Sequence, residues 1–332
     1  MKKLLFASTA LIASAGIAAA DVSVSGDGRM GVVWANNGVV GSGLPVTQDQ
    51  SQPGNPNWAF TNRIRISFSA SGETDSGLTF GGSIRADNAP AGAAGTQGNV
   101  YVDGAFGKLS MGNVDSGDKA IIGQLHSVGL TGLGFMNELG YEADGGNMNG
   151  LPGANVTAPA RVLYEYDMQG FSFAASHSQT GSNKSAAIGA GYEMAGFNVG
   201  IGYGERRNSA GPGWRARDIT ATGGYDFGDF SVKAIAQDKR YTSAGAQLER
   251  QRSYGVSGSG TFDLVGVSAY VLRTNSNFAN NTTTNAGIGA SYDLGGGASL
   301  QGGLSRQQMF AYDGAGTVNT QTVADFGVSL SF

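Results

Sequence analysis

The C-terminal stretch Gln321-Thr-Val-Ala-Asp-Phe-Gly-Val-Ser-Leu-Ser-Phe332 decides the fold. Small or polar side chains occupy one parity of this stretch, and apolar side chains occupy the other, at Phe326, Val328, Leu330 and Phe332. An alternation of period two is typical of a β-strand with one apolar and one polar face. A strand of this kind that ends on an aromatic residue indicates a membrane β-barrel, with lipid outside and water inside.

The N-terminus predicts export from the cytoplasm. Met1-Lys2-Lys3 is a short basic start, Leu4 to Ile17 is mostly apolar, and Ala18-Ala19-Ala20 supplies a cleavage site before Asp21. This pattern predicts a secretory signal peptide over residues 1–20, which is too short to span a membrane as a helix. We therefore expect the mature chain, residues 21–332, to begin at Asp21.

Composition agrees with an exported all-β protein. The chain has no Cys, so a closed sheet rather than disulfides would have to supply rigidity. The formal net charge of −4 argues against a nucleic-acid partner. Gly is abundant at 56 residues and Pro scarce at 7, without the G-X-Y repeat of collagen.

Alternating segments recur along the whole chain and predict about 16 antiparallel strands, an even number as closed bacterial barrels have. Short turns join many of them, at 195–196, 228–229, 265–266 and 295–297. Longer polar loops are expected at the other strand ends, near 205–217, 240–250, 276–284 and 308–319. The predicted fold class is therefore an all-β, transmembrane antiparallel barrel with a water-filled lumen.

One interval breaks this rhythm. Between the strand Lys108-Leu-Ser-Met-Gly-Asn113 and the strand that begins at Arg161 lies a long segment, residues 114–159. A structureless excursion of such length is usually functional. In a large barrel we expect it to fold into the lumen.

Four stretches carry a family resemblance: Val24-Ser-Gly-Asp-Gly-Arg-Met-Gly-Val32, Asp103-Gly-Ala-Phe-Gly-Lys-Leu-Ser-Met-Gly-Asn113, Gly289-Ala-Ser-Tyr-Asp-Leu-Gly-Gly-Gly-Ala-Ser-Leu300 and Val323-Ala-Asp-Phe-Gly-Val328. With them the chain resembles the general diffusion porins of α-proteobacterial, Rhodobacter-type outer membranes. The resemblance runs from Asp21 to Phe332.

The resemblance implies a 16-stranded homotrimer whose third external loop, here 114–159, narrows each pore. It implies passive diffusion of small hydrophilic solutes and ions across the outer membrane of a Gram-negative bacterium. Outer-membrane lipid and lipopolysaccharide would be its surroundings, and no enzymatic activity is expected.

A charged constriction is expected where this loop faces the first three strands. Parity places four basic residues inside the barrel, because they would be costly against lipid: Arg29, Arg63, Arg65 and Arg85. The loop carries five acids that could face them: Asp115, Asp118, Glu138, Glu142 and Asp144. Opposed acidic and basic walls would put a transverse field across the pore and favour polar solutes.

Other chemistry has little support in the sequence. The glycine motif from Gly26 to Gly31 lies inside a strand, whereas a dinucleotide site needs it between a strand and a helix. The two histidines, His126 and His177, lie far apart in a chain without Cys, so no cofactor, metal or catalytic site is expected on them. A Ca²⁺ ion held by Asp115 and Asp118 remains a weak candidate.

Two alternatives stay open at this point. A substrate-specific sugar or anion channel would need an aromatic track through the lumen. A surface adhesin or structural outer-membrane protein would show a fixed repeat of about 20 to 30 residues. In the predicted barrel Phe332 is the expected assembly signal, because a barrel left open exposes an unpaired strand edge to lipid.

Overall fold

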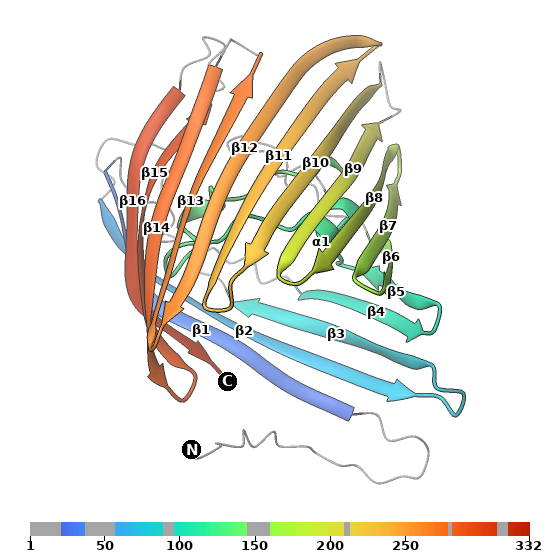
Figure 1. The fold of residues 1–332 in the computed structure, drawn as a ribbon, viewed down its shortest axis with the longest axis horizontal. Coiled ribbons are helices and arrows are strands. Elements are labelled where there is room, and N and C mark those ends of the chain that lie inside the picture. Colours follow the sequence, from blue (N-terminus) through green and yellow to red (C-terminus); the bar gives the residue numbers. More distant parts are fainter. Residues whose placement is uncertain are drawn as a thin grey trace.

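The computed structural model of the chain describes residues 21–36, 57–88, 96–144, 160–208, 213–277, 281–310 and 318–332. The strands of these segments form one closed antiparallel barrel, in which β1 completes the ring by pairing with β16 (Figure 1). The strands are β1 Asp21–Ala35, β2 Trp58–Glu73, β3 Thr79–Asn88, β4 Thr96–Gly104, β5 Gly107–Gly112, β6 Arg161–Met168, β7 Phe171–Thr180, β8 Asn183–Met194, β9 Phe197–Asn208, β10 Trp214–Asp226, β11 Phe230–Ser243, β12 Ala246–Phe262, β13 Val265–Ser276, β14 Asn281–Gly295, β15 Ala298–Phe310 and β16 Val318–Ser331. The predicted all-β, antiparallel barrel is confirmed, whereas the predicted signal peptide, 1–20, lies outside the described residues.

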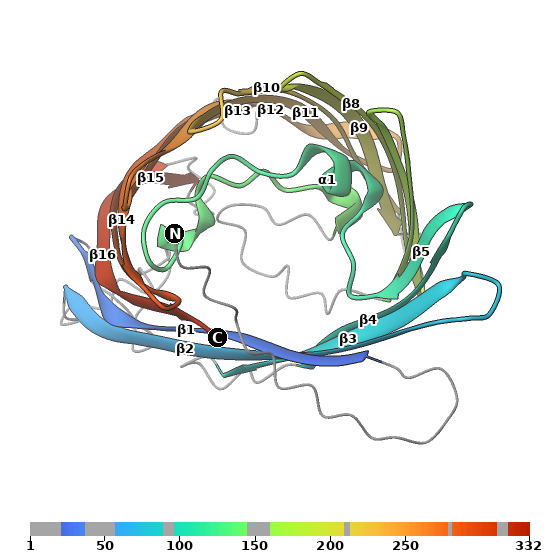
Figure 2. The same cartoon turned by 60° about the horizontal axis from the view of Figure 1, so that its bottom comes forward.

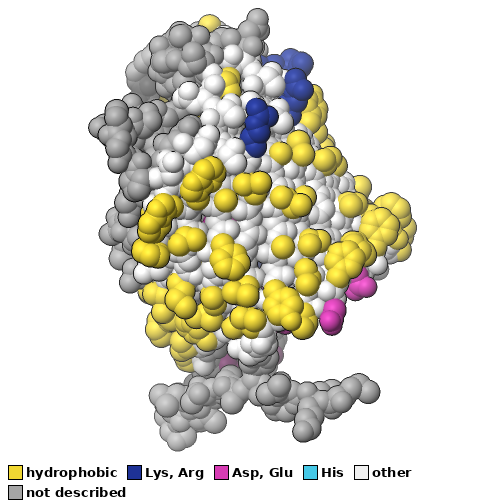
Figure 3. All heavy atoms as spheres, turned by 90° about the vertical axis from the view of Figure 1, so that its left-hand side faces the viewer, with side chains coloured by type: hydrophobic (Ala, Val, Ile, Leu, Met, Phe, Trp, Pro, Cys, Tyr) yellow, Lys and Arg dark blue, Asp and Glu magenta, His cyan; other side chains and the backbone are white. Residues whose placement is uncertain are grey.

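Alternate side chains of the strands face outward and inward as the sequence predicts. In β1, Val24 and Met30 are 62% and 58% exposed, whereas Val33 is fully buried inside the barrel. Outward apolar side chains form a band around the wall (Figure 3). Aromatic rings pack in pairs beside the short turns, as Phe197 does with Tyr225 at 4.3 Å between ring centroids. Such rings are typical of a membrane–water interface.

The two ends of the barrel differ. At the end that holds the turns predicted at 195–196 and 228–229, which we call the turn end, neighbouring strands meet in tight hairpins. Gln169 and Gly170 both have positive φ there, 50° and 84°, as a two-residue hairpin turn requires. The opposite end, from which the segment after β5 departs, we call the loop end.

One expected long loop at the loop end is wrong. Residues 240–250 are mostly strand, because β11 continues to Ser243 and β12 begins at Ala246. Only Ala244 and Gly245, both with positive φ, form the turn. The backbone hydrogen bonds between β11 and β12 continue through these polar and charged residues beyond the apolar band. Polarity alone therefore does not mark the end of a strand.

The seam between β1 and the C-terminus is closed by the terminal residue. Phe332 accepts a hydrogen bond from the Gly26 amide at 2.6 Å and donates one to the Gly26 carbonyl at 3.0 Å. Its ring covers Gly26, where a Cβ would lie 2.5 Å from a ring carbon. The glycine motif of β1 therefore serves close packing against the last residue of the chain.

The segment between β5 and β6 has a described part that lies inside the barrel, along the inner faces of β7 to β16 and opposite β2 to β4 (Figure 2). We call its described part, residues 113–144, the inner loop. It contains three short helical turns: α1 Gly117–Ile122, η1 Leu133–Phe135 and η2 Glu142–Asp144. The remainder of the predicted constriction loop, 145–159, lies outside the described residues.

Among the described residues, no helix has the length and apolar character needed to cross a membrane.

Inward-facing glycines make room for the inner loop. A Cβ on Gly202 of β9 would lie 2.7 Å from the Cβ of Asp118, and one on Gly289 of β14 would lie 2.6 Å from the amide nitrogen of Gly129. The loop and the wall share a buried apolar cluster: Ile122, Leu125, Val128, Leu133, Met136, Leu139 and Tyr141 pack with Ile235, Tyr270, Leu272, Met309 and Val323. Much of the barrel's interior is thus a packed contact between loop and wall.

Candidate functional site

The inner loop is tied to the closing seam by a carboxylate. Asp325 of β16 accepts hydrogen bonds from the amide of Leu130 at 3.0 Å and from the amide and hydroxyl of Thr131, both at 2.6 Å. Arg29 of β1 donates to the Leu130 carbonyl at 3.3 Å. Both strands of the seam therefore hold the same point of the loop.

A second anchor is built around Glu142, which is fully buried. Its carboxylate pairs with Lys239 of β11 at 3.0 Å and Arg206 of β9 at 3.2 Å, and accepts a hydrogen bond from Tyr241 at 2.5 Å. Burial alone would raise the pKa of Glu142, but the two cations and the phenol outweigh it and hold the pKa below its ordinary value. Breaking such a buried pair by removing one partner is strongly destabilising.

Asp118 is also buried against the wall. Its Oδ1 accepts hydrogen bonds from the Ser116 hydroxyl at 2.5 Å and the Lys119 amide at 2.9 Å. Its Oδ2 has no hydrogen-bond partner among the described residues and lies beside Gly204 and Asp218 of the wall. Burial accordingly raises the pKa of Asp118.

Asp118 and Glu142 therefore lie on the wall side of the loop, although the sequence alone could not show which of the five loop acids face the arginines. Both side chains are 0% exposed. They fill polar sites between loop and wall, where neighbouring donors satisfy most of their oxygens.

Three loop acids are less deeply buried and gather around Lys119. Asp115, 54% exposed, and Asp144, 22% exposed, each pair with Lys119 at 2.8 Å, and Asp144 also pairs with Arg161 at 2.8 Å. Glu138 belongs to the same group: burial raises its pKa, Lys119 lowers it, and Asp115 and Asp144 raise it further. This group combines the three carboxylates with the two cations.

The four predicted arginines are brought together on neighbouring strands. Arg29 of β1 lies directly opposite Arg63 of β2, and Arg65 is the next inward position of β2. Arg85 of β3 lies opposite Ser67, one inward position beyond Arg65. Arg63 also pairs with Asp27 at 2.6 Å. β2 and β3 lie across the lumen from α1 of the inner loop (Figure 2), whereas β1 contacts the loop at Leu130.

A left-handed turn in the inner loop was not foreseen from the sequence. Four consecutive residues have positive φ: Gly132 at 76°, Leu133 at 45°, Gly134 at 77° and Phe135 at 57°. This conformation costs roughly 1–2 kcal/mol for each non-glycine residue. Leu133 is fully buried, and its carbonyl accepts a hydrogen bond from Gln307 at 2.5 Å, whereas Phe135 is 45% exposed. The alternating glycines Gly132 and Gly134 were the sequence feature from which this turn could have been predicted.

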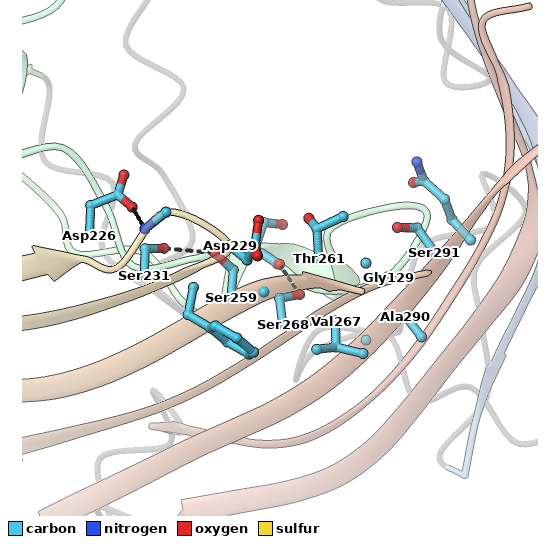
Figure 4. Close-up of a pocket in the computed structure, with 17 residues that line it drawn as sticks. Gly129, Asp226, Asp229, Ser231, Ser259, Thr261, Val267, Ser268, Ala290 and Ser291 are labelled. Atoms are coloured by element: carbon cyan, nitrogen blue, oxygen red, sulfur yellow. Dashed lines mark hydrogen bonds between the residues drawn. The ribbon is translucent and has the colours of Figure 1, made fainter. Parts of the chain in front are cut away.

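A polar recess of about 380 Å³ lies at the turn end of the lumen, next to the inner loop (Figure 4). Its lining is rich in hydroxyl groups and comes from β11 to β14: Ser231, Ser259, Thr261, Ser268 and Ser291. His126 of the inner loop lies 2.8 Å from the hydroxyl of Ser257 and 3.1 Å from that of Ser231. This side of the loop is therefore lined by groups that hydrogen-bond to water and polar solutes.

The two histidines do not converge, since His126 of the inner loop contacts hydroxyl groups of β11 and β12, whereas His177 is exposed on β7. Among the described residues, no group of three or more His, Cys, Asp or Glu side chains could hold a metal ion. Of the Ca²⁺ candidates, Asp115 pairs with Lys119 and Asp118 is bonded to Ser116.

Several functional residues were missed from the sequence: Asp325, Lys119, Arg161, Asp218 and Lys239. Asp325 lies on the polar parity of the C-terminal strand, so its inward direction was predictable. Its partner was not, because an irregular loop has no periodicity that gives the direction of Leu130 or Thr131.

A closed barrel with an apolar outer band, a polar interior and a loop fixed within it defines an outer-membrane diffusion channel. The model of the Gram-negative porin family matches residues 7–309. The chain belongs to this family. It is 31% identical over 337 residues to the porin of Rhodobacter capsulatus, with 94% of this chain and 100% of the relative covered.

Solved structures agree with this placement. A porin structure refined at 1.8 Å resolution is 29% identical, with a TM-score of 0.69 over 94% of this chain and 100% of that one. The anion-selective porin of Comamonas acidovorans has a TM-score of 0.71 over the same shares at 15% identity, which shows a common fold.

The chain is thus a multi-pass channel protein of the Gram-negative outer membrane for passive diffusion of small hydrophilic solutes, and not an enzyme. The adhesin alternative is excluded by the same match.

Proposed function

We propose that this channel sorts ions and small solutes by charge, at a passage between the four arginines and the acids near Lys119 of the inner loop. One observation carries the proposal: Arg29, Arg63, Arg65 and Arg85 lie on the adjacent strands β1 to β3, and β2 and β3 lie across the lumen from α1 of the inner loop, where Lys119 pairs with Asp115 and Asp144 (Figure 2). Opposed charges would orient polar solutes and hinder apolar ones.

Neutralising the arginine wall tests the proposal. The variant Arg63→Gln, Arg65→Gln, Arg85→Gln is expected to shift the zero-current potential toward cation preference in a KCl gradient across a planar bilayer. Conductance should rise or hold steady, because the barrel wall stays intact. An unchanged potential, or a shift toward anions, would show that these arginines do not line the ion path.

The functional unit is proposed to be a homotrimer, with outer-membrane lipid and lipopolysaccharide around it. The family resemblance supports the trimer, and one solved structure with the same fold, from Vibrio cholerae, is described as a trimer form. Detergent-extracted protein should migrate as a trimer that falls to monomer on boiling. A monomer in mild detergent would contradict the proposal.

A further inference from the structure

Two carboxyl groups meet inside the contact between the inner loop and the barrel wall. Asp118 of α1 and Asp218 of β10 are both 0% exposed. They converge over Gly204 of β9, where a Cβ would clash with Oδ2 of Asp118 and lie 2.9 Å from Oδ1 of Asp218. We call these two residues the carboxyl pair.

The carboxyl pair has no cation of its own. Within the described segments, neither member forms an ion pair: the ammonium group of Lys119 binds Asp115 and Asp144 instead, and the nearby cations of β9 and β11 bind Glu142. Beyond residue 20, the stretches between the described segments contain no Lys, Arg or His. A counter-charge from those stretches is therefore excluded by their composition.

The other titratable groups around the pair do not supply positive charge to it. Asp144 and Glu142 add negative charge, since Asp144 acts on Asp118 and Glu142 acts on Asp218. The phenol of Tyr141 donates its hydrogen bond to the Gly123 carbonyl at 2.6 Å. Two acids thus face the pair from the inner loop, and the one phenol there is already engaged.

The two oxygens of Asp118 differ in their surroundings. Oδ1 accepts hydrogen bonds from the Ser116 hydroxyl at 2.5 Å and from the Lys119 amide at 2.9 Å, as an acceptor oxygen should. Oδ2 is buried and receives no hydrogen bond from any described residue. A buried, ionised oxygen without a donor is costly.

Both oxygens of Asp218, in contrast, have donors. Oδ1 accepts a hydrogen bond from the Glu142 amide at 2.8 Å, and Oδ2 accepts one from the Thr220 hydroxyl at 3.2 Å. Asp218 is therefore placed to carry a negative charge, and Asp118 is placed to be neutral. Two buried carboxyl groups at close range do not both ionise, because like charges in a medium of low polarity repel strongly.

We propose that the carboxyl pair binds one proton, held at Oδ2 of Asp118 and directed at Asp218, and that this proton fastens α1 of the inner loop to β9 and β10. Because α1 packs against β7, β8 and β9 and carries Lys119, the proton also fixes the position of the acids that gather around Lys119. This inference goes beyond charge sorting at the arginines and does not depend on it.

Loss of the proton should loosen the inner loop as the pH rises. Two negative charges would then face each other over Gly204 without a cation between them. Burial raises the pKa of Asp118, so the folded protein binds this proton more tightly than the unfolded chain does. The stabilisation is therefore complete at low pH and is lost as the pH rises through the titration of the pair. At alkaline pH the noise of the open channel should increase severalfold.

Two asparagine variants separate this proton from an ordinary loop anchor. In Asp118→Asn the amide oxygen can keep the bonds to Ser116 and Lys119, while the amide nitrogen offers Asp218 a donor at every pH. Asp325→Asn is the matched contrast, because both oxygens of Asp325 accept hydrogen bonds from the loop and an amide nitrogen would face a donor there.

Thermal unfolding in detergent and single-channel recording in planar bilayers are carried out from mildly acidic to alkaline pH. Asp118→Asn should match wild type at acidic pH and remain stable and quiet at alkaline pH. Asp325→Asn should melt below wild type at neutral pH and should keep the loss at alkaline pH. If Asp118→Asn loses as much stability as Asp325→Asn, or if wild type does not change with pH, the proposal is wrong.

Infrared spectroscopy detects the proton directly. Wild type at neutral pH should show the carbonyl band of a protonated carboxyl group. The band should disappear in Asp118→Asn and in Asp218→Asn, and it should persist in Glu138→Gln. A band that is unchanged in both Asn variants overturns the proposal. If a chelator, or the exchange of Na⁺ for K⁺, lowers the melting temperature of wild type as much as alkaline pH does, a metal ion rather than a proton occupies the pair and the proposal fails.

Discussion

Leu133 and Phe135 share an unfavourable left-handed conformation but differ in what their side chains touch. The first is sealed between the inner loop and β15, and the second projects with 45% of its surface exposed. Strain of this kind persists only where the surroundings enforce it, and it gathers at functional sites. The exposed ring of Phe135 is therefore held in place by the burial of Leu133.

The two residues should respond in opposite ways to glycine, which adopts this conformation freely. Leu133→Gly should cost about 2–4 kcal/mol, because the lost burial exceeds the relieved strain. Phe135→Gly should be as stable as wild type or up to about 1 kcal/mol more stable, because strain is relieved and little burial is lost. Thermal unfolding in detergent measures both. Vesicle swelling with sugars should show faster permeation through Phe135→Gly, and equal destabilisation by the two changes would contradict this account.

Glu138 should make selectivity depend on pH. Its pKa is raised above the ordinary 4.5, chiefly by burial, so its carboxyl becomes neutral earlier than an exposed glutamate as pH falls. Cation preference should therefore decline while the pH is still above 4.5. Because the folded protein keeps this proton more tightly than the unfolded chain, stability should fall as pH rises through the same window.

The measurement is the zero-current potential of wild type and Glu138→Gln over a series of pH values. The substitution should remove the part of the change in zero-current potential that begins above pH 4.5. Asp263→Asn, in the turn between β12 and β13, is the control and should leave the curve unchanged. If the Glu138→Gln variant gave the same curve of potential against pH as wild type, Glu138 would be ruled out as the source of the pH dependence.

At the scale of elements, the strands of the wall are fitted to the loop by glycines. A Cβ at Gly289 would lie 2.6 Å from the Gly129 amide nitrogen, whereas a Cβ at Gly258 would have its nearest neighbour, the Ser231 carbonyl oxygen, at 3.4 Å. Gly289→Ala should displace the inner loop, raising open-channel noise and protease cleavage at Lys119. Gly258→Ala should leave both unchanged. Unchanged open-channel noise in Gly289→Ala would show that the inner loop accommodates the added methyl group without moving into the lumen.

Strand parity could be read from the sequence, and strand ends could not. The alternation in β1 and β2 placed Arg29, Arg63 and Arg65 on one wall, because a period of two fixes the facing of every residue. The residues 240–250 looked like a loop because charge replaces apolar residues above the membrane, although the backbone ladder continues through them.

The inner loop marks the other limit of sequence-based prediction. Its location could be inferred from its length and from the family resemblance. The direction of Glu142 could not, since it is held at the wall by donors from strands distant in the sequence, such as Lys239. The direction of Asp118 could not either, since the space it fills depends on Gly202 and Gly204 of β9. Tertiary contacts, rather than local pattern, set those positions.

For the whole molecule, closure depends on Phe332. Deleting it removes both backbone hydrogen bonds to Gly26 and the ring that covers this glycine. The truncated protein should reach the periplasm but assemble poorly, because an unpaired edge in lipid leaves polar backbone groups unsatisfied.

Pulse-labelling followed by a heat-modifiability gel would measure assembly. Phe332→Tyr, which keeps the ring and the backbone, is the matched control and should assemble well. A normal yield of the truncated protein at the cell surface would contradict the assignment of Phe332 as the assembly signal.

The bond between Asp325 and the loop at Leu130 and Thr131 also bears on the order of events during folding. The partners are 195 and 194 positions apart in the chain, so this contact can form only after nearly the whole polypeptide has been delivered. Contacts of such high sequence separation form late and slowly. The final strand therefore closes the barrel and anchors the inner loop in the same step. A nascent chain that stalls before β16 would leave its inner loop without that anchor, so the loop is fixed in the lumen only when the barrel closes.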